Sequence, residues 1–166
     1  CYKALNPDLM VAPFAYSRQM KKIVQMMKFE DISGLANSFS GVLADLLQKV
    51  VEDPAIIPIP LSAERIRYRG YNQSRLIAEG LSQKTGWKMI ELLNRKPTDL
   101  SQVEADSKVA RKQNVKGVFT VRKGPIPGVV VILDDVITTG STMEEACRVL
   151  KKAGVKKVIA CALAMG

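Results

Sequence analysis

The sequence lacks histidine altogether and contains only three cysteines among its 166 residues. Cys1, Cys147 and Cys161 are far apart in the chain, whereas structural zinc sites use four ligands that usually come in closely spaced pairs. A zinc site built from neighbouring residues is therefore excluded. The scarcity of cysteine also predicts a protein that works in a reducing compartment, the cytoplasm.

Long apolar segments are missing as well. The longest uninterrupted apolar run, Val158 to Met165, is far too short to span a bilayer. The chain does not open with a basic and then apolar leader that ends at small residues. We therefore predict a protein that is neither secreted nor inserted into a membrane.

Acidic residues are few relative to basic ones, since 25 Lys and Arg stand against 16 Asp and Glu and give a net charge of +9. Nucleic acid, an anionic membrane surface and a small polyphosphate would all be attracted by this charge, and a surface of solvated lysines is the structural alternative. The composition, with 47% hydrophobic and 25% charged residues, is that of a globular protein. The length predicts one domain over residues 1–166.

Residues 1–54 are predicted to form a scaffold of one strand and two helices. Residues 11–16 have the composition of a short strand, and apolar residues then recur at the spacing of one buried helix face. These apolar residues are Met20, Ile23, Val24 and Met27. Ser33 can cap a second, longer helix, which ends before Pro54.

Residues 55–166 alternate between predicted strands and helices and form the sheet core. The predicted strands are residues 55–60, 88–93, 119–122, 129–133 and 158–164, and the predicted helices are residues 73–85 and 141–152. A polar, aperiodic segment from Arg95 to Lys108 predicts a long loop, and loops of that length are uncommon unless functional. The alternation predicts an α/β fold with a central, mostly parallel sheet flanked by helices.

Two adjacent carboxylates, Asp134 and Asp135, follow the most apolar of these predicted strands. In α/β proteins ligands bind beyond the carboxyl ends of the strands. Two neighbouring carboxylates repel each other, which costs stability unless a ligand uses them, and ribose hydroxyls are suitable donors. We therefore predict that Asp134 and Asp135 bind a sugar.

The segment after the acidic pair has the composition of a phosphate-binding loop. It consists of Thr138, Thr139, Gly140, Ser141 and Thr142, just before a predicted helix. A glycine lets successive backbone N–H groups converge on an anion, the hydroxyls add donors, and a helix N-terminus is electropositive. An ordinary turn and an ordinary helix cap would explain each half alone, but the combination favours a ribose-phosphate site. The glycine and lysine spacings of a P-loop or a dinucleotide-binding loop are absent.

The segment Val129 to Thr142 resembles the ribose-phosphate signature of type I phosphoribosyltransferases. A longer pattern is similar to that of the ComF competence-protein family. It comprises Pro58-Ile-Pro60-Leu61, Arg65, Arg69-Gly70-Tyr71-Asn72-Gln73, Arg95, Thr98, Gln102, Arg111, Asn114-Val115, Gly117 and Phe119. This resemblance implies a phosphoribosyltransferase fold and a role in natural transformation with single-stranded DNA and competence proteins as partners. It also implies an N-terminal zinc module, of which only Cys1 could be a remnant here, so we expect that this module is absent from the chain or was cut away.

The resemblance to type I enzymes also implies where a diphosphate would bind. One loop would hold it and a second would close over it, at positions 61–71 and 95–111. The implied contacts are Leu61, Ser62, Arg65, Arg69, Arg95, Lys96 and Arg111. Mg²⁺ is expected to be carried by the diphosphate, without direct protein ligands. Arginine side chains suit diphosphate oxygens, but any single one of these arginines could equally be a solvated surface residue.

The sequence leaves several functions open. The leading one is a protein that binds 5-phosphoribosyl-1-diphosphate and serves competence, with Tyr68 and Tyr71 able either to stack on bases of single-stranded DNA or to pack half-buried. The alternatives are a nucleobase or amine phosphoribosyltransferase in nucleotide salvage and a non-catalytic sensor of phosphoribosyl diphosphate. In an enzyme, Asp134 and Asp135 would be the catalytic residues that hold the ribose.

Overall fold

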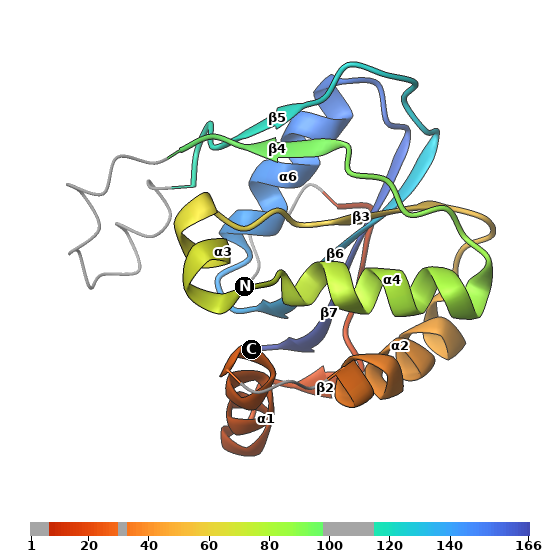
Figure 1. Cartoon of the computed structure of the whole chain (residues 1–166). Helices are drawn as coiled ribbons and strands as arrows, with labels where there is room; N and C mark the ends of the chain where they lie inside the picture. Colours follow the sequence, from red (N-terminus) through yellow and green to blue (C-terminus); the bar gives the residue numbers. More distant parts are fainter. Residues whose placement is uncertain (1–6, 30–32, 98–114) are drawn as a thin grey trace.

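The computed structural model describes residues 7–29, 33–97 and 115–166, without the side chains of residues 28, 29 and 33 (Figure 1). Along the chain the elements are β1 Leu9–Val11, β2 Phe14–Ala15, α1 Arg18–Phe29, α2 Ser33–Leu47, β3 Ala55–Pro58, α3 Ala63–Arg69, α4 Gln73–Thr85, β4 Leu93–Arg95, β5 Phe119–Val121, β6 Val129–Ile137, α6 Ser141–Lys152 and β7 Lys157–Met165. Most of the predicted loop, together with Cys1, Thr98, Gln102, Arg111 and Asn114, lies outside the described residues.

The main sheet is parallel and has the strand order β1-β7-β6-β3, with β2 also paired to β7. Val131 of β6 lies opposite Ile159 of β7 on one side, and Ile132 lies opposite Ile57 of β3 on the other. A second, two-stranded antiparallel sheet is formed by β4 and β5. The predicted α/β fold with a mostly parallel sheet is therefore confirmed.

Both faces of the main sheet are covered, because successive residues of a strand point to opposite sides. Val131 and Leu133 pack into the cluster that contains side chains of α1, α2 and α4. Val130 and Ile132 pack into the other cluster, with residues of α6, β4 and β5. This three-layer arrangement, visible in Figure 1, explains why β6 and β7 are apolar almost throughout rather than alternating.

Helices α2 and α4 pack closely because Gly80 has no side chain. A Cβ atom at Gly80 would lie 2.5 Å from Oγ of Ser40 on α2. The Ser40 hydroxyl is fully buried and lies 2.7 Å from the carbonyl of Ala36 and 3.0 Å from that of Ile77. The predicted helices 73–85 and 141–152 have the expected bounds, and Gly86 ends α4 with φ 76°.

Two predicted strands are wrong in their bounds. The strand predicted over 11–16 is split into β1 and β2 around Pro13, which has no backbone N–H to donate. The strand predicted over 88–93 makes only an isolated bridge between Met89 and Ile56, and β4 begins at Leu93. The chain leaves the edge of β3 there and pairs with β5, a choice of partner that local composition does not encode.

Candidate functional site

The acidic pair lies inside β6, not after it, because the strand continues to Ile137. The alternation of faces is interrupted at this point, since Leu133 and Val136 both pack toward the cluster of α1, α2 and α4. The Asp134 carboxylate accepts the N–H of Asp135 at 2.9 Å, and the Asp135 carboxylate accepts the N–H of Val136 at 2.8 Å. Both side chains are partly exposed at the carboxyl end of the sheet.

Ser74 holds the carboxylate of Asp134 from a neighbouring element. Its Oγ donates to Oδ1 of Asp134 at 2.9 Å, and the residue is only 2% exposed. Ser74 lies in the first turn of α4, where the side chain of Asn72 accepts the Ser74 N–H at 3.0 Å and donates to the carbonyl of Ile59 at 2.9 Å. The sequence analysis missed Ser74, although it directly follows the motif at Arg69–Gln73.

The loop that follows β6 brings the predicted phosphate-binding residues together. Gly140 has φ 75°, in the left-handed region that favours glycine, and α6 begins at the next residue. Gly140 is the N-cap residue of α6, and among the described residues no side-chain hydrogen bond caps the helix there. The hydroxyls of Thr139 and Ser141 are 3.1 Å apart. A hollow of about 30 Å³ is lined by Asp134, Val136, Ile137, Thr138, Thr139, Gly140, Ser141, Thr142 and Met143.

The geometry of this hollow suits an anion beside a polyol. The helix N-terminus offers backbone N–H groups and a positive dipole end, and the loop hydroxyls can turn toward the same ligand. Asp134 lines the hollow, so carboxylate acceptors for sugar hydroxyls lie next to the donors for a phosphate. A sugar phosphate is the kind of ligand that would satisfy both.

Arg95 lies near Asp134, and Arg65, from a further segment, lies near Arg95. Burial lowers the pKa of Arg95, the nearby charge of Arg65 lowers it further, and Asp134 acts in the opposite direction. The Arg95 guanidinium carbon lies 5.5 Å from the centre of the Phe119 ring. Its Nε is buried and has no hydrogen-bond partner among the described residues. A buried donor of this kind suits an anionic ligand.

The segment predicted as a diphosphate loop over 61–71 contains the short helix α3. The Ser62 side chain caps it by accepting the N–H of Arg65 at 3.3 Å, and Gly70 ends it with φ 79°. Leu61, just before the helix, is half-buried. Arg69 is also half-buried, and its guanidinium donates to Oε1 of Gln73 at 3.3 Å. Capping residues at both ends were present in the sequence, but no apolar periodicity marked the helix.

The remaining predicted contacts are divided between the end of β4 and the undescribed segment. Arg95 is the last residue of β4, and the exposed Lys96 follows it with its N–H donating to the carbonyl of Val118 at 2.8 Å. Arg111 lies outside the described residues. The structure therefore places Arg65 near Arg95 and Arg95 near Asp134. The contact predicted for Arg111 stays a prediction.

Glu145 is a second residue that the sequence analysis missed. Its carboxylate lies on α6, is 6% exposed, and accepts the N–H of Gly117 at 2.7 Å and two N–H groups of Arg148. Hydrogen bonding from Arg148 lowers the pKa of Glu145, burial opposes this, and the Gly117 N–H adds to the lowering. Glu145 thereby fastens the turn before β5 to the helix that follows the phosphate loop.

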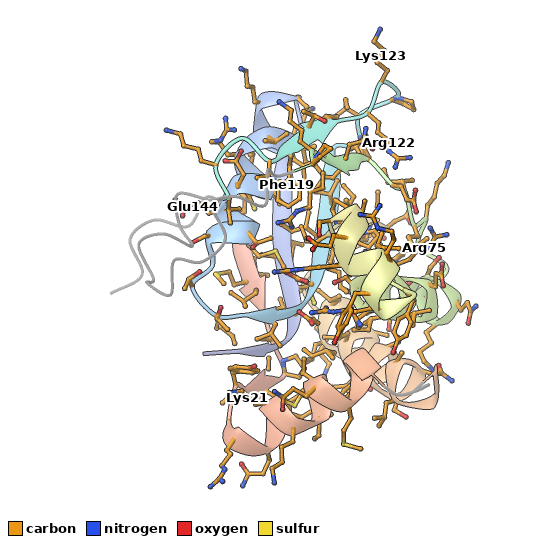
Figure 2. All side chains as sticks on the ribbon, turned by 60° about the vertical axis from the view of Figure 1, so that its left-hand side comes forward. Lys21, Arg75, Phe119, Arg122, Lys123 and Glu144 are labelled. Carbon is orange, nitrogen blue, oxygen red and sulfur yellow. The ribbon has the colours of Figure 1, made fainter. Side chains whose placement is uncertain are left out.

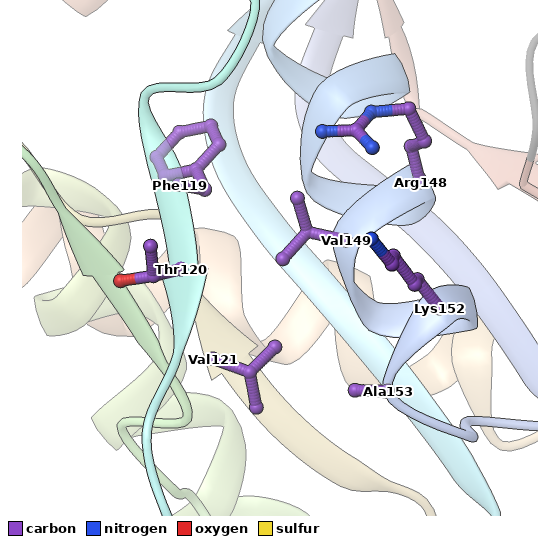
Figure 3. A pocket seen from close by; sticks show the side chains of 7 residues that line it. All are labelled: Phe119, Thr120, Val121, Arg148, Val149, Lys152 and Ala153. Carbon is purple, nitrogen blue, oxygen red and sulfur yellow. The ribbon is translucent and has the colours of Figure 1, made fainter.

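A second, larger recess lies elsewhere. It has a volume of about 300 Å³ and is lined by Phe119, Thr120, Val121, Arg148, Val149, Lys152 and Ala153, between β5 and the later turns of α6 (Figure 3). On α6 this recess begins at Arg148, about 8 Å along the helix axis from Met143 of the hollow at Gly140, and the two share no lining residue.

The two described cysteines contribute to packing. Cys147 and Cys161 are buried on opposite faces of the sheet, and burial raises the pKa of each thiol to about 12. Across the described residues, no three His, Cys, Asp or Glu side chains are grouped so that they could hold a metal ion. Nor does that part of the chain contain a helix long and apolar enough to cross a bilayer.

Comparison with known proteins identifies the class first. Residues 86–166 match the family model of the phosphoribosyl transferase domain. An allosteric regulatory enzyme of purine biosynthesis superposes with a TM-score of 0.50 at 24% identity, over 75% of this chain and 24% of that one. Glutamine phosphoribosylpyrophosphate amidotransferase from B. subtilis gives 0.53 at 22% identity, over 76% and 25%. The chain therefore has the type I phosphoribosyltransferase fold.

Curated relatives then identify the family. Competence protein F of Haemophilus influenzae is 34% identical over 169 residues, which cover 91% of this chain and 70% of the relative. Competence protein ComFC of Bacillus subtilis is 29% identical over 85% of this chain, and DNA utilization protein YhgH of Escherichia coli K12 is 30% identical over 86%. The chain belongs to the ComF competence-protein family. It spans 57% and 64% of the lengths of the Bacillus subtilis and Streptococcus pneumoniae relatives.

Proposed function

We propose that this chain binds 5-phosphoribosyl-1-diphosphate or a closely related ribose phosphate. The ribose hydroxyls would donate to Asp134 and Asp135, and the 5′-phosphate would bind the loop Thr138 to Thr142. One observation carries the proposal: Asp134, held by Ser74 at 2.9 Å, lines the same hollow as the amides that begin α6. Acceptors for a sugar and donors for its phosphate thus share one small space.

The diphosphate would bind on the arginine side of this hollow. Arg95 lies near Asp134 and Arg65 lies near Arg95, and the buried Nε of Arg95 has no partner among the described residues. Leu61, Ser62, Arg69, Lys96 and Arg111 are proposed as further contacts. Mg²⁺ would enter with the diphosphate and neutralise part of its charge.

A link to competence supports a second component of the proposal, the handling of single-stranded DNA. The relatives are named competence and DNA utilization proteins, and the net charge of +9 favours polyanions. The alternative function, transfer of the phosphoribosyl group to a nucleobase or an amine, would require a pocket for that acceptor. The recess of about 300 Å³ between β5 and α6 shares no lining residue with the hollow at Gly140.

Ligand-induced stabilisation tests the sugar-phosphate site. Phosphoribosyl diphosphate with Mg²⁺ should raise the melting temperature more than ribose 5-phosphate or diphosphate alone, because only the complete ligand occupies both sides. Replacing Asp134 and Asp135 together by Asn should remove this shift without unfolding the protein. An undiminished shift in the double variant would contradict the assignment. Release of diphosphate, measured in the same samples, separates turnover from binding.

A further inference from the structure

Helix α3 is unusual because it contributes nothing to the core. All of its residues are described, and none of them is buried. A helix of only seven residues is not stable by itself in water, and here capping by Ser62 and Gly70 holds its ends. Tyr71, just beyond it, donates its hydroxyl to the carbonyl of Met27 at 2.8 Å and anchors the segment to α1.

The exposed side chains of α3 are those of a polyanion-binding surface. The helix carries Arg65, Arg67 and Arg69 against a single glutamate, and Tyr68 between them is 78% exposed. Figure 2 shows α3, in yellow, at the surface in front of α4. Most of the Tyr68 side chain is therefore accessible to a ligand that approaches α3 from solvent.

The arginines of α3 do not all point at one ligand. Successive helix residues are rotated by about 100°, so Arg65 and Arg69 lie about 40° apart while Arg67 lies on roughly the opposite side. Arg65 is the member close to Arg95, which in turn lies near Asp134. Arg67 therefore faces away from the hollow and is available to a second anion, and Tyr68 lies between the two directions.

We propose that α3 is the contact surface for single-stranded nucleic acid, with Tyr68 stacking on a base and Arg67 binding a backbone phosphate. A single exposed ring can stack only on a base whose face is open, which excludes a paired duplex. Tyr71 does not share this role because its hydroxyl is engaged with Met27. The inference rests on the proposed handling of single-stranded DNA and adds where the strand binds.

Binding of a fluorescent oligo(dT) to the full chain tests this surface. Tyr68→Ala should weaken binding at least about fivefold, whereas Tyr68→Phe, which keeps the ring, should bind like wild type. Arg67→Ala should lower the slope of log affinity against log salt by about 0.7, the value expected for one lost phosphate contact. Lys123→Ala is the matched control, because Lys123 is exposed and lies far from α3 (Figure 2).

Three outcomes overturn the inference. If Tyr68→Ala and Arg67→Ala bind oligo(dT) as wild type does, α3 is not the surface, and the proposed DNA handling still stands. If wild type binds no single strand, or binds a duplex or anionic vesicles equally well, the DNA component of the function falls too. If Lys123→Ala weakens binding as much as Arg67→Ala, bulk charge accounts for the effect. Tyr68→Ala should keep the stabilisation by phosphoribosyl diphosphate, which confirms an intact fold.

Discussion

The hydroxyl of Ser74 donates to Oδ1 of Asp134 at 2.9 Å across a separation of 60 residues. This bond ties the first turn of α4 to the end of β6, and Asn72 extends it to the carbonyl of Ile59 at 2.9 Å. The carboxylate is therefore oriented before any ligand arrives. Such preorganisation reduces the cost of binding, because the acceptor does not have to be ordered at that moment.

Ser74→Ala should weaken the binding of phosphoribosyl diphosphate about tenfold while lowering the free energy of unfolding by only about 1 kcal/mol. The larger effect on binding is expected because Asp134 keeps the Asp135 N–H but loses its orientation toward the hollow. Calorimetric titration and urea unfolding measure the two quantities. Ser82→Ala is the matched control, since it removes a hydroxyl that donates to Trp87 farther along α4. Equal affinities of Ser74→Ala and wild type would refute the positioning role.

Gly140→Val should abolish stabilisation by ribose 5-phosphate, because a β-branched residue is strained at φ 75° and the loop amides would have to move. The proper comparison is Gly86→Val, at φ 76° and without atoms within 4 Å of an added Cβ. Both variants should lose about 1–2 kcal/mol of stability from backbone strain. Only the change at Gly140 should cost ligand binding, and retention of binding there would refute the phosphate site.

Glu145→Gln should reduce the dependence of stability on acid pH. The lowered pKa of Glu145 means that its contribution is complete above the unfolded-state pKa and is lost as pH falls through the folded-state value. At neutral pH the substitution should cost on the order of 1–2 kcal/mol, since the bonds from Arg148 and Gly117 are made to a charged group. Urea unfolding between pH 7 and pH 3 measures this. An unchanged pH profile, compared with Glu144→Gln, would show that Glu145 is not the group responsible.

Gly80→Ala should lower the free energy of unfolding by about 1–3 kcal/mol through overpacking. The new methyl group would lie 2.5 Å from Oγ of Ser40 and 3.0 Å from its Cβ, so α2 and α4 must separate. Adding Ser40→Ala removes the nearer atom and should restore part of the loss, a coupling that a double-mutant cycle detects. Strictly additive effects would mean that the two helices relax independently.

Much of the sheet core was predictable from the sequence. The apolar runs of β6 and β7, the bounds of α4 and α6, and the glycines after them are written in composition and spacing. The acidic pair followed by Thr138 to Thr142 also indicated its chemistry directly, because a phosphate loop needs neighbouring residues of particular types. These features are local, so a short stretch of chain contains all the information for each.

Only the tertiary structure decided which distant residues complete the site and which faces are exposed. Ser74 reaches Asp134 because the parallel strands β3 and β6 end at the same edge of the sheet. Packing between other elements lets Glu145 fasten Gly117 and brings Arg65 near Arg95. The two tyrosines that the sequence left open between stacking and packing also differ in the structure, because the Tyr71 hydroxyl donates to α1 whereas Tyr68 is 78% exposed. Residue types and their spacing determine the elements and the phosphate loop, whereas contacts across the chain depend on packing that no local pattern encodes.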